Sequence, residues 1–98
     1  MILIDATLLR AVDLLVQGAI RLFAEDGVGV AVPDISPGPN GSIDLHWRRP
    51  GRELLLNVPA APDEPAHYYG DDGDGAEAVE GALDPADASV WLMRWLMG

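Results

Sequence analysis

The sequence contains no cysteine, and its basic residues are few and unevenly placed. Without cysteine the chain has no disulfide framework, thiol catalysis or thiolate metal site, and it suits a reducing compartment. Six arginines and no lysine stand against 16 acidic residues, so the formal net charge is −10. No Lys or Arg occurs between Arg52 and Arg94, so the C-terminal half of the chain is strongly acidic. A segment with such an excess of negative charge repels phosphate backbones and anionic membranes. We therefore expect no direct contact with nucleic acid or a membrane surface.

A long uninterrupted apolar run is also missing. Residues 1–15 are largely apolar, but no basic segment precedes them and Asp5, Arg10 and Asp13 interrupt them, unlike a signal peptide or a membrane span. The chain of 98 residues is near the lower limit for folding without disulfides or metals, and its 49% apolar content provides a modest core. We expect a single cytoplasmic domain spanning residues 1–98.

Residues 5–25 are predicted to form a helix with Asp5 as its N-cap, which ends before Gly27. Helical spacing predicts a stripe that faces the core: Leu8, Ala11, Val12, Leu15, Ala19, Leu22 and Phe23. Four further apolar residues widen this arc beyond what one sheet face covers: Leu9, Leu14, Val16 and Ile20. The wider arc has two interpretations, burial against the sheet and a second helix, or contact with a partner.

The clearest strands lie in residues 42–58, where apolar and polar residues alternate on both sides of Pro50-Gly51 and predict an antiparallel hairpin. Further strands are expected at residues 66–69 and 76–83, and Gly81 indicates a bulge or a close backbone approach. Residues 28–32 are a short β-prone run, whereas residues 33–41 have too much Pro and Gly for regular structure.

This order predicts an α+β fold, an antiparallel four- to five-stranded meander sheet flanked by an N-terminal and a C-terminal helix. The C-terminal helix is expected at residues 85–97, and both helices are expected on one face of the sheet. Between residues 90 and 97 only Arg94 is polar, and a helix that is apolar all round needs burial on more than one side.

Trp, Met and Arg are enriched at protein interfaces, so the C-terminal helix is a candidate binding surface. Its predicted partner-binding residues are Trp91, Met93, Trp95 and Met97. The partner is another protein or a second copy of the chain. The alternative is that this helix closes the apolar face of the sheet.

The acidic turn at residues 71–75 invites comparison with a calcium loop. Counting from Asp72, Asp74 takes position 3 of the loop, but Ala76 and Glu77 take positions 5 and 6, where an oxygen ligand and Gly are needed. The calcium pattern fails, and no metal is predicted. The acidic stretch 63–87 is either a solubilising surface or, through Asp71, Asp72 and Asp74, a docking surface for a basic partner that normally binds nucleic acid.

No catalytic pattern is present in the sequence. The two histidines, His46 and His67, are expected two strand spacings apart, about 10 Å, without a third metal ligand in register. No serine occupies a Gly-x-Ser-x-Gly elbow, and no glycine cluster continues into a phosphate-binding motif. We expect no enzymatic activity and no cofactor. The alternative is a ligand-binding or enzymatic domain that uses Asp44, His46, His67 or Tyr69 on a polar sheet face.

The runs PGPNGSIDLHW, ELLLNVP, YYGDD and EGALD resemble a set of short bacterial proteins in which a G-S-I-D-x-x-W strand precedes an apolar strand and a YYG-containing strand. The resemblance covers roughly residues 33–84, about half of the chain. Those proteins carry no assigned activity, so the resemblance implies only a small antiparallel-sheet domain, with Trp47 and the alternating leucines in its core.

Together these patterns favour a small acidic protein–protein interaction module without catalytic activity. An antitoxin-like or inhibitor-like accessory of another bacterial protein fits best, with the C-terminal helix as its hydrophobic anchor and the acidic stretch as its electrostatic guide. The alternatives are the ligand-binding or enzymatic domain and the acidic mimic of nucleic acid.

Overall fold

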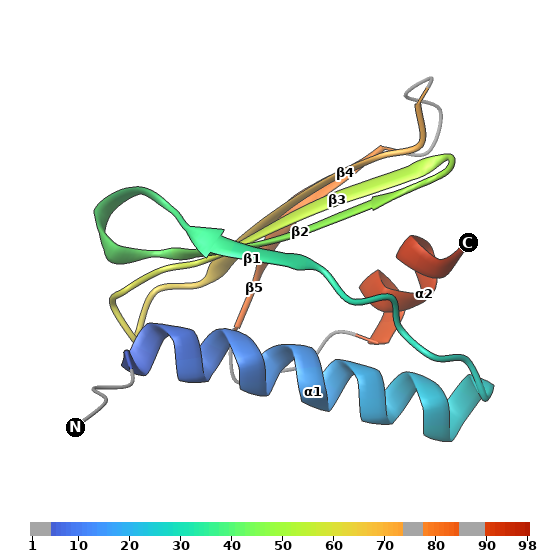
Figure 1. Ribbon diagram of the computed structural model, residues 1–98, viewed down its shortest axis with the longest axis horizontal. Coiled ribbons are helices and arrows are strands. Elements are labelled where there is room, and N and C mark those ends of the chain that lie inside the picture. The colour runs from blue at the N-terminus through green and yellow to red at the C-terminus, as the bar shows by residue number, and fades with distance from the viewer. Residues whose placement is uncertain (1–4, 74–77, 85–89) are drawn as a thin grey trace.

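The computed structural model describes residues 5–73, 78–84 and 90–98. Its elements in chain order are α1 Ala6–Asp26, β1 Asp34–Pro37, the 3₁₀ turn η1 Pro39–Gly41, β2 Ile43–Arg49, β3 Arg52–Val58, β4 Ala66–Asp71, β5 Val79–Leu83 and α2 Val90–Met97. The five strands form one sheet in the order β1-β2-β3-β4-β5, and each pair is antiparallel. Both helices lie on the same side of this sheet (Figure 1). The predicted α+β meander is confirmed.

Local signals determine both ends of α1. The Asp5 carboxylate accepts a hydrogen bond from the Thr7 N–H at 2.7 Å, which satisfies one of the free donors of the first turn. At the other end Gly27 has φ of 69°, and its N–H donates to the Phe23 carbonyl oxygen at 2.9 Å. The predicted N-cap and the predicted helix end are therefore confirmed.

The β2–β3 hairpin forms the centre of the sheet. Pro50 and Gly51 make its two-residue turn, and Gly51 has φ of 78°, a value that favours glycine. Alternation then directs one side of each strand into the core, where five side chains are fully buried: Leu45, Trp47, Leu54, Leu56 and Val58. The predicted hairpin and its inward-facing residues are confirmed.

The fifth strand is not where the sequence pattern placed it. The β-prone run 28–32 forms no strand, and β1 instead occupies Asp34–Pro37, within the segment that was expected to be irregular. Because β1 is an edge strand, Pro37 can lack its N–H without breaking a bond of the inner sheet. The run 28–32 crosses from α1 to the sheet instead, and the Trp47 indole N–H donates to the Ala31 carbonyl oxygen at 2.7 Å.

The buried stripe of α1 also differs from the prediction. Its buried residues are Thr7, Ala11, Leu14, Gly18 and Leu22, whereas Val12 and Phe23, which were expected in the core, are exposed. Apolar residues surround most of α1, so periodicity alone does not select one face. Close packing selects it, since a Cβ added to Gly18 would lie 3.3 Å from Cγ of Met93 in α2.

Glycines on the inner face of β4 and β5 make room for aromatic rings. A Cβ on Gly70 would lie 2.5 Å from Cη2 of Trp95, and a Cβ on Gly81 would lie 2.7 Å from the Tyr68 hydroxyl oxygen. Pairing of β4 with β5 continues through Gly81 in unbroken register. The prediction at Gly81 is therefore confirmed as a close approach rather than a bulge.

Two predicted boundaries lie partly outside the described residues. The strand predicted at 76–83 is observed as β5 from Val79, and residues 76 and 77 are among those not described. The helix predicted at 85–97 is observed as α2 from Val90, and residues 85–89 are not described. Within the described ranges, no helix combines the length and the apolar character that crossing a membrane requires.

Candidate interaction surface

The outer side of α1 carries five exposed apolar side chains, here called the outer ridge. Their exposed fractions are 53% for Leu9, 37% for Val12, 44% for Val16, 57% for Ile20 and 66% for Phe23. Steps of three and four residues keep these side chains on one side of the helix, opposite the buried stripe. The helix α1 is therefore apolar on two faces, and only one of them packs against its own chain.

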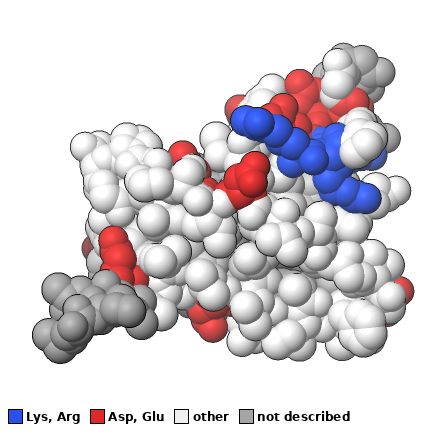
Figure 2. All heavy atoms as spheres, in the orientation of Figure 1, with Lys and Arg blue, Asp and Glu red and all other residues white. Residues whose placement is uncertain are grey.

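Figure 1 shows α1 lying beneath the sheet, with its outer side directed away from the strands. The surface over α1 is mostly uncharged in the same view (Figure 2). Arg10, near the start of α1, is directed toward the connection after β3, where its Nη2 donates to the Pro59 carbonyl at 3.0 Å and to the Ala60 carbonyl at 2.7 Å. This contact ties the first half of α1 to the sheet.

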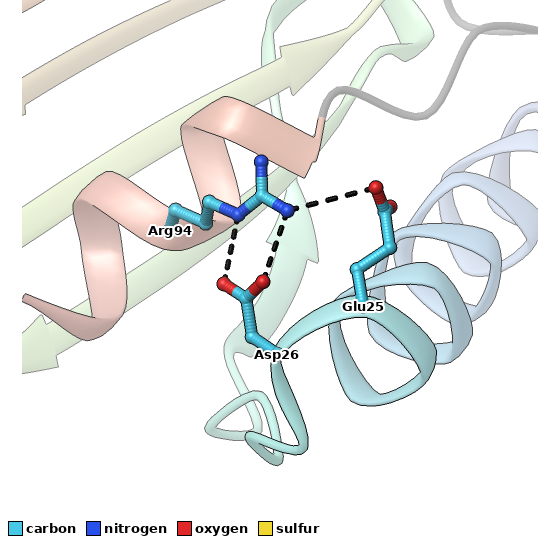
Figure 3. A network of polar contacts seen from close by, with 3 residues as sticks. All are labelled: Glu25, Asp26 and Arg94. Atoms are coloured by element: carbon cyan, nitrogen blue, oxygen red, sulfur yellow. Dashed lines mark hydrogen bonds and ion pairs between the residues drawn. The ribbon is translucent and has the colours of Figure 1, made fainter.

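An ion pair ties the other end of α1 to α2 (Figure 3). Arg94 donates from Nε to Asp26 Oδ2 at 2.7 Å and from Nη2 to Asp26 Oδ1 at 3.0 Å, and Nη2 lies 3.6 Å from Glu25 Oε1. The hydrogen bond from Arg94, aided by its charge, lowers the pKa of the Asp26 carboxyl below the ordinary value of 3.8. Both ends of α1 are thus held, and the outer ridge lies on a supported helix.

The four partner-binding residues predicted on α2 have different surroundings. Trp91 is 50% exposed and packs edge-to-face on Tyr68, with ring centroids 5.6 Å apart. Met93 is 3% exposed and packs on Gly18, so it belongs to the core of its own chain. The partner-binding role of these residues stays a prediction, and Trp91 presents the largest exposed surface among them.

Trp95 and Met97 are half-buried at the end of the β2–β3 hairpin. The Arg52 guanidinium carbon lies 4.8 Å from the centroid of the Trp95 ring, within the range of a cation–π contact. The Arg49 Nη1 donates to the Leu96 carbonyl and approaches Met97 Sδ, both at 3.1 Å. The hairpin arginines thus cover this part of α2.

The acidic residues predicted to dock a basic partner are only partly described. The Asp71 carboxylate accepts a hydrogen bond from the Gly73 N–H at 2.9 Å, and Asp72 is half-buried. Asp74 lies outside the described residues. On the face that Figure 2 shows, acidic side chains lie beside arginines at the hairpin end of the molecule. The docking role of the three aspartates stays a prediction.

The other face of the sheet is open and polar. One row of paired residues crosses all five strands, and a second row lies beside it. The first row is Asp34, His46, Leu55, Tyr69 and Glu80, and the second is Ser36, Asp44, Asn57, His67 and Ala82. The four residues proposed from the sequence for a polar sheet site therefore lie on one face, in two neighbouring rows. As expected, the histidines lie on the two strands that flank β3.

Local partners occupy part of this open face. His46 Nε2 lies 2.6 Å from Glu53 Oε2, and the Asp44 carboxylate accepts a hydrogen bond from Asn57 Nδ2 at 2.8 Å. His67 lines a shallow depression of about 410 Å³ at one end of the face. Among the described residues, no three His, Asp or Glu side chains are grouped so that they could hold a metal ion.

A hydrogen-bonded cluster that the sequence pattern did not reveal closes the β1–β2 connection. Asn57 Nδ2 also donates to Ser42 Oγ at 2.9 Å, and Ser42 Oγ donates to the Pro39 carbonyl at 2.6 Å. A Cβ on Gly38 would overlap Ser42 Oγ. The alternating pattern predicts strands around Ser42 and Asn57, but it does not predict that η1 packs against these two residues.

Comparisons of the chain with protein-family models, with curated proteins and with solved structures give no match. The class defined here is therefore structural, a five-stranded meander with two helices on one face and an apolar ridge on the outer side of α1.

Proposed function

We propose that the protein is a non-catalytic protein–protein interaction module and that it binds its partner through the outer ridge of α1. The observation that supports this most strongly is the apolar surface of the ridge, about 400 Å² if each whole side chain presents about 150–200 Å². Single exposed apolar residues are common, whereas the largest apolar patch on a protein surface, about 300–600 Å², is often functional.

The attachment of α1 to the rest of the chain supports the same proposal. The Arg10 contacts near one end of α1 and the Arg94–Asp26 pair at the other hold the helix against the rest of the chain. The surface is therefore already ordered, and binding a partner costs little conformational entropy. A straight ridge of branched and aromatic side chains suits packing against another helix or in an apolar groove.

An antitoxin-like or inhibitor-like accessory role belongs to this proposal, because such proteins act by covering a surface of their target. In this form of the proposal Trp91, which is 50% exposed on α2, is a second point of contact with the target. The net charge of −10 disfavours acidic partners and acts over a longer range than the apolar contact.

The test compares wild type with two variants that add the same charge to α1. Val16→Glu places a carboxylate in the middle of the ridge, and Gln17→Glu places one on an exposed position beside it. Tagged proteins are used to capture partners from a nuclease-treated lysate, and circular dichroism verifies their folds. A protein that wild type and Gln17→Glu retain in stoichiometric amount, and that Val16→Glu loses, supports the proposal. Identical captures by all three proteins contradict it.

A second candidate function, small-ligand binding, is favoured by the open face of the sheet. Asp44, His46, His67 and Tyr69 share that face, and His67 lines the depression beside Asn57 and η1. A ligand bound there raises the melting temperature of wild type and of Val16→Glu, but not of His67→Ala. If screening finds no ligand whose effect depends on His67, this second candidate is contradicted.

A further inference from the structure

The residues of the outer ridge are spaced symmetrically about its centre. Relative to Val16, the other four members lie at −7, −4, +4 and +7: Leu9, Val12, Ile20 and Phe23. Val16 is also the middle residue of α1, which has 21 residues. A ridge with this symmetry matches a second copy of itself when the second helix runs in the opposite direction.

We propose that the outer ridge binds a second copy of this chain, as an antiparallel α1–α1 pair with a two-fold axis beside Val16. This inference rests on the proposed function, because it names the partner of the same surface. About the axis, Leu9 faces Phe23 of the second copy, and Val12 faces Ile20. A smaller side chain meets a larger one at each of these positions, and Val16 meets its own equivalent. Such a contact is isologous and closed, as in most soluble homodimers.

The pairing is long enough to form a specific interface. A helix of 21 residues spans about 30 Å at about 1.5 Å per residue, and the pair overlaps along its full length. The two ridges together contribute about 800 Å² at about 150–200 Å² per whole side chain. Side chains that flank the two ridges add to this area, toward the lower end of specific interfaces, about 1,200 Å². A contact of this size is typical of weak, reversible association, so the dimer is expected to dissociate on dilution.

The charge of the chain determines how this dimer responds to salt. Two copies, each with a net charge of −10, repel one another, while none of the five ridge residues is charged. Salt screens repulsion between exposed charges and strengthens apolar contacts. The dimer is therefore expected to tighten as the salt concentration rises. A basic partner on an acidic surface shows the opposite response, so the salt dependence distinguishes the two occupants.

Sedimentation velocity of the purified full chain over a range of concentrations tests the inference. One chain has a mass of 10.4 kDa, and wild type and Gln17→Glu are expected to approach twice that mass as their concentration rises. In high salt they should reach it at lower protein concentration. Val16→Glu puts two carboxylates against each other at the axis, and we expect association at least about 100-fold weaker. Because Val16 is half-exposed, this variant should keep its fold, which circular dichroism verifies.

The outcomes separate this inference from the proposed function. A wild-type protein that stays at 10.4 kDa, or a Val16→Glu protein that dimerises as wild type does, overturns the pairing through α1. If wild type is a monomer but captures another protein that Val16→Glu loses, the self-pairing fails and the interaction module stands. If wild type neither dimerises nor captures a protein through the ridge, both fail.

Discussion

Substituting Gly70 in β4 tests the packing of α2 against the sheet. A Cβ at this position would lie 2.5 Å from Cη2 and 2.6 Å from Cζ3 of Trp95, and 3.0 Å from Cγ2 of Val79. Carbon atoms in good contact are about 3.5–4.0 Å apart, so Gly70→Ala creates an overlap of about 1 Å. The Trp95 ring must move, and the Arg52 guanidinium, 4.8 Å from its centroid, resists this movement.

Overpacking of this kind costs about 1–3 kcal/mol. For a chain of 98 residues that corresponds to a fall in melting temperature of about 5–20 °C. Urea and thermal unfolding of Gly70→Ala, followed by tryptophan fluorescence at fixed protein concentration, measure both quantities. The fluorescence of the folded state should also change, since Trp95 is displaced.

The matched control is Gly18→Ala in α1. Its Cβ would lie 3.3 Å from Cγ of Met93, a side chain that can adjust by a few tenths of an ångström. Alanine also improves helix propensity by about 1 kcal/mol, which offsets the crowding. We expect a net change within about 1 kcal/mol. If Gly70→Ala is as stable as wild type, or if both variants lose the same stability, the packing argument is wrong.

Three further perturbations test other parts of the structure. Because Arg94 lowers the pKa of Asp26, the pair contributes stability above pH 3.8, and this contribution is lost as pH falls through the lowered pKa. The difference in unfolding free energy between wild type and Asp26→Asn should therefore shrink progressively as the pH falls below 3.8, and a difference that stays constant with pH would contradict this. Trp47→Phe removes the hydrogen bond to the Ala31 carbonyl and should lower the free energy of unfolding by about 1–3 kcal/mol. Amide exchange in residues 28–32 should accelerate, and unchanged exchange would show that this bond does not hold the segment. In Gly38→Ala the new methyl group overlaps Ser42 Oγ, and the free energy of unfolding in urea should fall by about 1–3 kcal/mol. An unchanged stability would show that the hydrogen-bonded cluster around Ser42 can rearrange without cost.

Patterns that depend on neighbouring residues were predictable from the sequence. Alternation about Pro50-Gly51 determines which side chains of the hairpin face inward, and Asp5 and Gly27 form the ends of α1 through bonds within one turn. The adjacent tyrosines Tyr68 and Tyr69 point to opposite faces for the same reason, one half-buried and one exposed.

Features that depend on distant contacts were not predictable in this way. The choice between two apolar faces of α1 depends on Gly18 meeting Met93, far along the chain, so Val12 and Phe23 were assigned to the core. The strand β1 contradicts local propensity because an edge position tolerates Pro37.

The candidate surface was predictable only in part. Leu9, Val16 and Ile20 were recognised as apolar residues in excess of what the sheet could cover, and all three belong to the outer ridge. The ridge became recognisable as a continuous surface only when Val12 and Phe23 joined them, because the symmetric spacing needs all five residues.

The most direct measurement of the central structural claim, that the outer ridge of α1 pairs with the same ridge of a second copy, is a cysteine cross-link at Val16. The chain has no other cysteine, so Val16→Cys gives one thiol per copy. A disulfide forms only when the two Cα atoms come within about 7 Å, a distance that an antiparallel pair centred on Val16 allows. Mild oxidation is predicted to convert most of Val16→Cys to a covalent dimer, while Gln17→Cys stays largely monomeric. Equal cross-linking at both positions, or none at position 16, would contradict the self-pairing through α1.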